Sequence, residues 1–437
     1  MNTLHHIVIV GGGAGGIELA THLGHKLHKQ SQIKITLVDY SFTHIWKPLL
    51  HEVAAGTLNS YEDEINYLAH GFNHHYEFCL GKMIGLDRKN REIILAPLVS
   101  ENHTTQIIEQ RTLSYDTLVI AIGSITNDFN TPGVKDNCIF LDNRAQADQF
   151  HQKFINTLIS LQNKNSIPVN DILNIVIIGG GATGVELAAE LNYALLQSSY
   201  YGLSSANFVK NTQITLIEAA DRILPALPKR VSENTQKELE KLGIKIYCNE
   251  KVTKVTPSEF HMQSGLIIPA QFKIWTAGIK APDFLQNLDG LQTNRINQLI
   301  VDNTLRVSND EHIFAFGDCA SCPQLNSDRP VPPRAQAAHQ QASLLAKSLI
   351  NQINGKPLLP FNYYDYGSLI SLSKHTAIGN LMGRLLGSFW IEGKLARLFY
   401  ISLYKLHQLT LFGFWRVSLL TFANLLSQRV KPRLKLH

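Results

Sequence analysis

Two segments of the chain share one pattern of hydrophobic and polar positions. Each has four apolar β-type residues, then a glycine cluster, then apolar residues at helical spacing: IVIVGGGAGGIELA at 7–20 and IVIIGGGATGVELA at 175–188. Aligned over 7–23 and 175–191, the two copies agree at 12 of 17 positions without a gap. The pattern predicts a buried strand, a tight turn and a helix, and it predicts this unit twice.

The glycines of both copies have the spacing G-x-G-x-x-G. They are Gly11, Gly13 and Gly16 in the first copy and Gly179, Gly181 and Gly184 in the second. In a dinucleotide site the first glycine permits the turn, the second lets the backbone approach a pyrophosphate, and the third lets helix pack on strand. The phosphates then lie at the helix N-terminus. One such loop can be a plain strand-to-helix connection, but two loops favour a pair of dinucleotide sites.

Each unit also supplies the acid that a dinucleotide site needs for the adenosine ribose. IKITLVDY ends at Asp39 and TQITLIEA reaches Glu218, both directly after an apolar strand pattern. A carboxylate at Glu218 repels a 2′-phosphate, which favours NADH over NADPH at the second site. Arg222 nearby leaves that preference open. The Ser-rich stretch at 192–211 is expected to extend the second helix into an inserted loop.

Composition places the chain among compact proteins without disulfides. Hydrophobic residues make up 44% and charged residues 17% of 437 residues, which suggests two or three domains. The five cysteines, at 79, 138, 248, 319 and 322, are scattered and odd in number, as in a reducing compartment. MNTLHH leaves no room for a signal or transit peptide. No feature indicates nucleic-acid binding.

Cys319 and Cys322 form a C-x-x-C pair, which occurs in redox dithiols and in zinc sites. No second pair and no histidine pair at ligand spacing accompanies it, so we expect no metal site. Small residues that open a helix beside a flavin are the favoured interpretation. No cysteine follows Asp39 closely, which argues against a dithiol relay of the disulfide-reductase kind.

A third glycine motif indicates which dinucleotide each loop holds. FAFGDCA, at 314–320, resembles the second FAD fingerprint of the flavoproteins with two dinucleotide domains, which implies that Asp318 accepts a hydrogen bond from the flavin ribityl chain. YDTLVIAIGS (115–124) and FKIWTAGIKAPD (272–283), which contains Gly278, look like the strands that connect the two domains of that family.

The resemblance implies two doubly wound α/β domains with Rossmann-like topology. We expect an FAD-binding domain made of 1–125 and 295–380, an NADH-binding domain at 165–290 inserted between its halves, and a C-terminal membrane-association segment at 384–437.

Several further motifs together resemble the type II NADH dehydrogenases, which are single-subunit NADH:quinone oxidoreductases of respiratory chains. These are WKPLLHEVA, GGGATGVELAAEL, GIKAPDFL, GDCASCP, AQAAHQ and the terminal KPRLKLH. The resemblance covers essentially the whole chain and implies FAD as cofactor, NADH as substrate and a membrane quinone as acceptor.

The resemblance also assigns roles to individual residues. It implies that Gln336 and Gln340 shape the quinone site beside Ala335, with His339 as their neighbour. It places Glu186 at the contact of nicotinamide and flavin, and Lys47 with Pro48 at the flavin ring. Lys374, in the looser motif SLSKHTAIG, is implied as a catalytic residue by the weakest of these matches.

The C-terminal segment differs in charge from the rest of the chain. Residues 384–437 contain nine lysines and arginines and only one acid, Glu392, with apolar residues at helical spacing. Charges limit the uncharged pieces to 406–415 and 417–428, shorter than the roughly 20 apolar residues of a spanning helix. We therefore expect an amphipathic anchor on an anionic lipid surface. A helical hairpin that closes a dimer is a compatible alternative.

The function predicted from the sequence is oxidation of NADH through FAD, with transfer of two electrons to a quinone and no proton pumping. We expect a homodimer on the cytoplasmic face of the bacterial inner membrane. Two alternatives remain: a sulfide:quinone oxidoreductase, which needs reactive cysteines near the flavin, and an NADH-sensing flavoprotein whose tail docks a partner protein.

Overall fold

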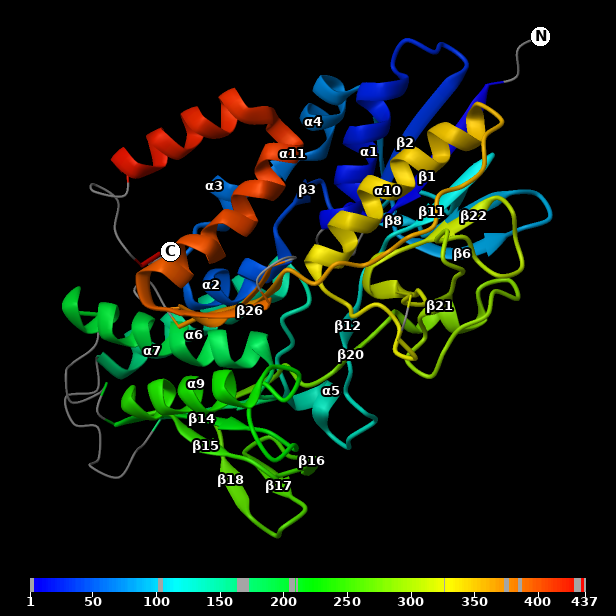
Figure 1. Cartoon of the computed structure of the whole chain (residues 1–437). Helices are drawn as coiled ribbons and strands as arrows, with labels where there is room; N and C mark the ends of the chain where they lie inside the picture. Colours follow the sequence, from blue (N-terminus) through cyan, green and yellow to red (C-terminus); the bar gives the residue numbers. More distant parts are fainter. Residues whose placement is uncertain are drawn as a thin grey trace.

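Two parallel β-sheets, one built around each copy of the repeated unit, organise the chain in this computed structural model (Figure 1). The structure describes residues 4–100, 105–162, 173–203, 209, 211–325, 327–372, 377–383, 387–427 and 434–435. Lys374 lies outside these residues, so its predicted role is not examined below. In both units the strand, turn and helix form as the hydrophobic pattern predicts.

The first sheet combines strands that are far apart in the sequence. Its order is β22 (Ile313–Ala315), β11 (Thr117–Ile120), β1 (His5–Val10), β2 (Ile33–Asp39) and β5 (Glu77–Leu80). All pairs are parallel, and the central strands carry runs of buried apolar residues, Ile7–Val10 in β1 and Leu118–Ile120 in β11, because both of their faces are covered. The helices α1 (Ala14–Leu27) and α10 (Ala335–Ile353) pack against each other over this sheet (Figure 1).

The second sheet repeats this arrangement with four parallel strands. Its order is β15 (Lys245–Tyr247), β14 (Thr212–Ile217), β13 (Leu173–Ile178) and β19 (Phe272–Trp275). The helices that accompany it are α6 (Arg144–Gln162), α7 (Ala182–Tyr200) and α9 (Lys229–Lys241). The cores of the two sheets are separate clusters of buried residues.

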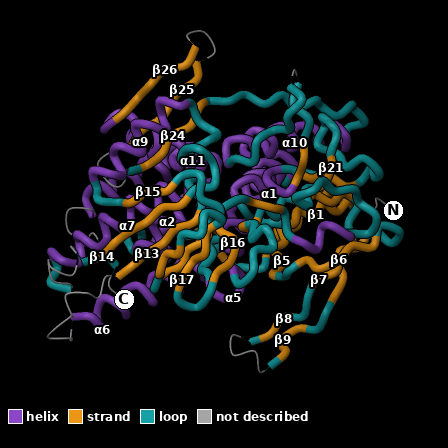
Figure 2. The backbone as a smooth tube through the Cα atoms, turned by 90° about the horizontal axis from the view of Figure 1, so that it is seen from below, coloured by secondary structure: helices purple, strands orange, loops and turns teal. Residues whose placement is uncertain are grey.

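Short elements connect and extend the two sheets. Paired β12 (Ile125–Thr126) and β20 (Ile279–Lys280) lie between them. The motifs expected to supply the connecting strands instead form β11 and β19 of the two parallel sheets, and the short β12–β20 pair follows them. Antiparallel sheets flank the parallel ones: β10 (Arg111–Ser114), β7 (Glu92–Leu95) and β6 (Met83–Asp87), and β16 (Val252–Val255), β17 (Glu259–Met262) and β18 (Ile267–Pro269). Figure 2 shows β8 (Leu98–Val99) and β9 (Gln106–Ile108) projecting from the body.

The segment that connects β2 to β5 of the first sheet is built of small elements. They are β3 (Thr43–His44), η1 (Lys47–Leu49), α2 (Leu50–Ala55), α3 (Ser60–Asp63), β4 (Ile65–Asn66) and α4 (Tyr67–His74). The remaining short elements are α5 (Val134–Asn137), η2 (Asp283–Asn287), β21 (Leu299–Ile300), η3 (Gly317–Cys319) and β23 (Ala320–Ser321). The motif GDCA therefore starts a single 3-10 turn followed by a short strand, and the α-helix expected there is absent.

The C-terminal region is an antiparallel sheet followed by a long helix. The sheet contains β24 (Gly367–Ser371), β25 (Ala377–Gly383) and β26 (Gly387–Glu392), and α11 spans Gly393–Ser427. The sequence led us to expect no segment long enough to cross a membrane. This expectation is wrong as far as length and composition go, because the helix at 395–427 is long enough and apolar enough to cross one. However, Gly413 has φ 75° and ψ 168°, which bends the helix into two parts.

Candidate functional site

The two glycine loops have the same backbone geometry. Gly11 has φ +103° and Gly179 has φ +107°, a region that L-residues with side chains rarely adopt. A methyl group on Gly16 would lie 1.8 Å from the Gly11 carbonyl oxygen, and one on Gly184 would lie 2.0 Å from that of Gly179. The first glycine of each loop thus makes the turn, and the third permits close packing of the helix on it.

The second glycine of each loop faces open space. A methyl group on Gly13 or Gly181 would meet no protein atom within 4 Å. These positions begin α1 and α7, where unpaired N–H groups and the helix dipole favour an anion. Packing within the protein does not require glycine at these two positions, so the space beside them is free for a ligand. The two loops therefore fit two phosphate-containing ligands.

The predicted ribose acids end the second strand of each unit and lie against the loops. The Gly12 N–H donates to Asp39 Oδ2 at 2.6 Å, and the Gly180 N–H donates to Glu218 Oε2 at 2.7 Å. Burial raises the pKa of Asp39, while hydrogen bonds from backbone N–H groups oppose that effect. Matching contacts in the two units thus put each carboxyl against the glycine loop of its own unit.

Three residues from distant segments meet near the first loop. Lys47 Nζ donates to the Ser124 carbonyl oxygen at 2.7 Å, and Ser124 Oγ donates to Asp318 Oδ2 at 2.8 Å. Gln298 Nε2 donates to the Asp318 carbonyl oxygen at 2.9 Å. Lys47 and Asp318, both predicted for the flavin, are thus joined through Ser124, which lies at the end of the strand motif YDTLVIAIGS and was missed as a site residue.

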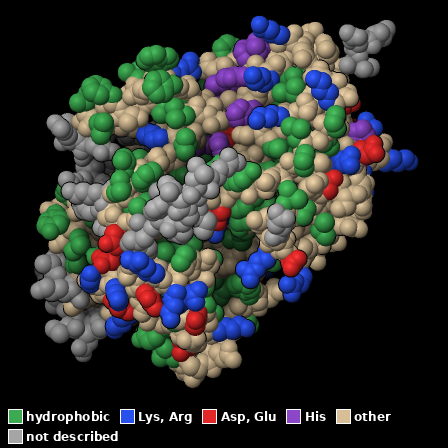
Figure 3. Space-filling model, viewed as in Figure 1, with side chains coloured by type: hydrophobic (Ala, Val, Ile, Leu, Met, Phe, Trp, Pro, Cys, Tyr) green, Lys and Arg blue, Asp and Glu red, His purple; other side chains and the backbone are tan. Residues whose placement is uncertain are grey.

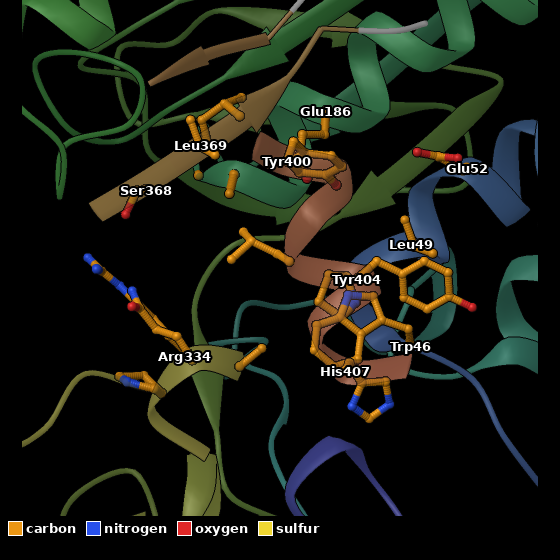
Figure 4. Close-up of a pocket in the computed structure, with 18 of the residues that line it drawn as sticks. Trp46, Leu49, Glu52, Glu186, Arg334, Ser368, Leu369, Tyr400, Tyr404 and His407 are labelled. Atoms are coloured by element: carbon orange, nitrogen blue, oxygen red, sulfur yellow. The ribbon is translucent and has the colours of Figure 1, made fainter. Parts of the chain in front are cut away.

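A cleft of about 2670 Å³ lies between the two sheets and α11. Figure 4 shows Glu186 beside Tyr400 at one end of the drawn region, with Trp46, Tyr404 and His407 gathered at the other. The predicted residues that line the cleft are Gly179, Gly181, Glu186, Glu218, Gly278, Ala335, Gln336 and Gln340. The first loop, Asp39, Lys47 and Asp318 are not part of this lining. The cleft therefore continues from the second loop to the C-terminal helix.

Glu186 is a buried acid on the wall of this cleft. Burial raises its pKa to about 8, although the Ser371 N–H donates to Glu186 Oε1 at 2.9 Å and opposes the shift. His51 Nδ1 lies 3.6 Å from Glu186 Oε2, and burial lowers the pKa of His51 to about 4. Both groups are thus uncharged at neutral pH, and their contact is not an ion pair. Glu186 can donate a proton into the cleft.

Gln336 and Gln340 lie on the same face of α10 and bond to one neighbouring segment. Gln340 Nε2 donates to the Tyr364 carbonyl oxygen at 2.8 Å and its Oε1 accepts from the Tyr364 N–H at 3.0 Å. Gln336 makes the same pair of contacts with the Gly367 carbonyl oxygen and the Tyr366 N–H, both at 3.1 Å. Both amides therefore hold the backbone that precedes and begins β24 against the cleft wall.

The two C-x-x-C thiols are buried and belong to the core. Burial raises the pKa of both Cys319 and Cys322 to about 12, and Cys319 Sγ lies 3.3 Å from the Phe316 carbonyl oxygen. Both side chains remain thiols at neutral pH and are poor nucleophiles. Among the described residues, no group of three or more histidine, cysteine, aspartate or glutamate side chains is arranged to hold a metal ion.

Sequence inspection named His339 but missed Glu18, His407 and the contacts among the three residues. Glu18 accepts hydrogen bonds from His339 on α10 and from His407 on α11, both at 2.6 Å. All three residues line the cleft. The signal that could have found Glu18 is the repeat itself, because Glu18 occupies in the first copy the position of Glu186 in the second.

Comparisons with known proteins agree with this geometry. The sequence profile of the pyridine nucleotide-disulphide oxidoreductase family matches residues 5–342. A type II NADH:quinone oxidoreductase from Haemophilus influenzae is 44% identical over 99% of this chain and 100% of its own length. One from Staphylococcus aureus is 28% identical over 86% of this chain and 90% of its own.

Solved structures share the fold at low sequence identity. The structure of NDH2 from Plasmodium falciparum in complex with NADH superposes with a TM-score of 0.83 at 20% identity, covering 98% of this chain and 99% of that one. The sulfide:quinone oxidoreductase of Aquifex aeolicus superposes with a TM-score of 0.71 at 18% identity, covering 98% and 96%. By its sequence and its fold, this chain belongs to the pyridine nucleotide-disulphide oxidoreductase family and, within it, to the type II NADH:quinone oxidoreductases.

Proposed function

We propose that this chain oxidises NADH at the second glycine loop and reduces a membrane quinone, with FAD held on the first loop. The observation that carries the proposal is the cleft, which joins Gly181 and Glu186 to the apolar side chains of α11. A polar nucleotide and a lipid-soluble acceptor need different walls, and this cleft has both. The full-length similarity to a type II NADH:quinone oxidoreductase supports the same activity.

The first unit fits a flavin dinucleotide. Gly13 leaves space at the N-terminus of α1, Asp39 bonds to the Gly12 N–H, and Asp318 bonds to Ser124. These contacts support the proposal that Asp39 binds the ribose and Asp318 the ribityl chain. When bound, FAD supplies the hydride acceptor and the reductant that pass electrons from NADH to the quinone. The protein then orients both reactants and limits the access of water to the site.

The second unit favours NADH over NADPH. The Glu218 carboxylate lines the cleft beside Gly181 and would repel a 2′-phosphate. Arg222, the cation that could offset this repulsion, donates to the Pro225 carbonyl oxygen at 3.1 Å and lies 3.7 Å from Asp221. These contacts direct the guanidinium toward Pro225 and Asp221, which limits its use for a 2′-phosphate.

The remaining predicted residues are proposed to position the reactants. Glu186 offers an uncharged carboxyl to the nicotinamide end of the cleft. Gln336 and Gln340 shape the acceptor end by fixing the segment at 364–367. Gly278, with φ +64°, and Ala335, at the first turn of α10, line the cleft between these two ends.

We propose that α11 attaches the enzyme to the cytoplasmic face of the bacterial inner membrane without crossing it. Figure 3 shows hydrophobic side chains over the second half of α11. Trp415, in this half of the helix, is 83% exposed. The bend at Gly413 and the charges of Lys405 and Arg416 suit a helix that lies in the interface. An enzyme attached in this way offers no ion path, so it would not pump protons.

We propose that it acts as a homodimer.

The two alternatives are less consistent with the site. A sulfide:quinone oxidoreductase needs reactive cysteines, whereas burial raises the pKa values of Cys138, Cys319 and Cys322 to about 12. An NADH-sensing flavoprotein would have no use for a cleft with an apolar acceptor end.

The proposal is tested by an anaerobic titration of the purified holoenzyme, following the visible flavin band. We expect NADH to bleach the band rapidly and a short-chain quinone to restore it rapidly, also after alkylation of all thiols. Loss of activity on alkylation would favour the sulfide enzyme. Bleaching without fast recovery would overturn the assignment of quinone as acceptor.

A further inference from the structure

The repeated unit places one buried glutamate at the same position of each copy. Glu18 follows Gly11 by seven residues, as Glu186 follows Gly179. Glu18 is fully buried and Glu186 is 6% exposed, and both line the cleft. The duplication therefore brings two acids, one from each unit, to the same cavity. Only Glu186 is accounted for by the function proposed above.

A single helix covers both acids. Tyr400 and His407 of α11 are seven residues apart, about two helical turns, and so lie on the same face. Tyr400 lies beside Glu186 in Figure 4, while His407 Nδ1 lies 2.6 Å from Glu18 Oε1. Folding of the C-terminal helix therefore completes the surroundings of both duplicated acids.

Glu18 is the centre of a chain of hydrogen bonds. Its Oε2 bonds to His339 Nδ1 at 2.6 Å, and its Oε1 bonds to His407 Nδ1 at 2.6 Å. His407 Nε2 lies 3.0 Å from His44 Nε2, and His44 Nδ1 lies 2.9 Å from the Gly12 carbonyl oxygen. The chain runs from the backbone of the first glycine loop to the cleft.

The donors and acceptors in this series of hydrogen bonds require a hydrogen between His407 and Glu18. The Gly12 carbonyl can only accept, so His44 Nδ1 carries a hydrogen; burial lowers the pKa of His44 to about 3, so its Nε2 is an acceptor. His407 must then donate through Nε2 to His44. Its contact with Glu18 through Nδ1 needs one more hydrogen, carried by the ring or by the carboxyl. The contact between His407 and Glu18 therefore holds a hydrogen of its own, separate from the one that joins His339 to Glu18.

The surroundings also favour the protonated form of His339, on the other side of Glu18. Burial acts to raise the pKa of Glu18, but the hydrogen bonds from His339 and His407 outweigh it and hold that pKa below its usual value. The Glu18 carboxylate raises the pKa of His339 against the effect of burial. The other titratable groups that face the cluster are His22 on α1, His44 on β3, His70 on α4 and Lys347 on α10.

His339 connects the cluster to the apolar end of the cleft. Its side chain is 42% exposed, whereas Glu18 and His407 are 1% and 2% exposed. It lies between Gln336 and Gln340 on α10 and shares the cleft wall with the exposed side chains of Leu403 and Leu406 on α11. A ring that can release a proton therefore faces the apolar region that suits a quinone.

We propose that His339, held by Glu18 and His407, donates the proton that completes reduction of the quinone. This inference rests on the proposed function. NADH supplies two electrons and one hydrogen as hydride, and the quinone needs a further proton to become the quinol. That proton moves from His339 Nε2 to a quinone oxygen. His339 keeps its Nδ1 hydrogen on Glu18 and regains a proton from water through its exposed edge.

The decisive experiment separates the two half-reactions of the holoenzyme in a stopped-flow instrument. In H339Q and E18Q we expect reduction of the flavin by NADH at the wild-type rate, because neither residue acts in that step. We expect its reoxidation by a short-chain quinone to slow by about 10²-fold in H339Q, the size of a general-acid effect. Wild-type reoxidation should slow as the pH rises through the pKa of His339.

The pH profile distinguishes proton donation from a structural role. In E18Q the profile should shift to lower pH, because the carboxylate that raises the His339 pKa is absent, and in H339Q the decline should disappear. H22Q is the matched control: His22 is half-buried on α1 and faces Glu18, yet burial lowers its pKa, so the change removes no charge. H22Q should keep the wild-type profile.

A measurement without turnover provides a second test. Imidazole ¹⁵N resonances of the holoenzyme should show His339 protonated above its ordinary pH range in the wild type and in H22Q, but not in E18Q. Wild-type reoxidation rates in H339Q, or an unchanged profile in E18Q, would overturn the inference. Failure of wild-type enzyme to reoxidise with quinone would instead overturn the proposed function. If E18Q does not fold, the reoxidation rate of H339Q alone tests the inference. H339Q should fold, because the His339 side chain is partly exposed.

Discussion

At the scale of single residues, the balance between burial and hydrogen bonding determines the protonation of the two duplicated acids. Glu186 and Glu18 occupy equivalent positions, yet their pKa values shift in opposite directions. Burial dominates at Glu186, whose neighbour His51 is itself neutral, whereas two histidine hydrogen bonds dominate at Glu18. The same residue type at the same repeat position thus becomes a neutral acid in one unit and a carboxylate in the other.

The raised pKa of Glu186 makes stability depend on pH. Above its unfolded value of 4.5 the unfolded chain releases this proton, while the folded protein keeps it up to about 8, so folding is progressively weakened as the pH rises between these values. E186Q removes the effect and can still accept from the Ser371 N–H. We expect E186Q to match wild type at pH 4 and to exceed it at pH 9 by up to roughly 5 kcal/mol.

The measurement is chemical denaturation of wild type and E186Q between pH 4 and pH 9. A difference in the free energy of unfolding that stays constant over this range would contradict a raised pKa.

At the scale of elements, the glycine loops show which positions serve packing and which serve the ligand. Gly181 and Gly184 lie one helical turn apart at the start of α7, and neither has a positive φ. A methyl group on Gly184 would lie 2.0 Å from a backbone oxygen, whereas one on Gly181 meets nothing. The sequence identified both glycines, and the structure separates their roles.

The two alanine variants should therefore fail in different ways. We expect G184A to lose about 2 kcal/mol or more of stability, because the helix must move away from the turn. We expect G181A to fold with wild-type stability but to raise the KM for NADH at least about 10-fold, because the methyl group occupies space meant for the pyrophosphate. Thermal unfolding and steady-state kinetics check both. Equal melting temperatures for the two variants would contradict this division of roles.

At the scale of the whole molecule, α11 links the wall of the cleft to an exposed apolar face. Its first half packs on α1 and β24–β26 and covers the cleft, while its second half, beyond Gly413, presents apolar side chains outward (Figure 1, Figure 3). Leu419 and Phe422 are 70% and 62% exposed. Such a face suits insertion into the interface of a bilayer, so that a quinone can enter the cleft from the lipid.

Charges on this face should release the enzyme from membranes without stopping its chemistry. We expect L419E/F422E to bind vesicles of anionic lipid at least about 10-fold more weakly, because two carboxylates would enter the apolar layer and face anionic headgroups. NADH oxidation with a water-soluble quinone should remain unchanged. Ser418 is exposed on the same helix turn, and S418E is the matched control. Vesicle sedimentation measures binding, and equal binding by both variants would contradict the proposed attachment.

The sequence by itself determined the repeated strand, turn and helix, because the glycines and buried apolar runs act locally. It also singled out Asp39 and Glu218 as the acids at the ends of the second strands, each of which lies beside its glycine loop. These features depend on neighbours in sequence, and the structure reproduces them.

Only the tertiary structure decided which side chains meet. The contacts of Glu18 with His339 and His407 join segments more than 300 residues apart, and so no local pattern contains them. The bonds of Gln336 and Gln340 to the segment before β24, and the joining of two short apolar runs into α11, likewise follow from packing. Protonation states depend on burial, which the folded chain alone establishes.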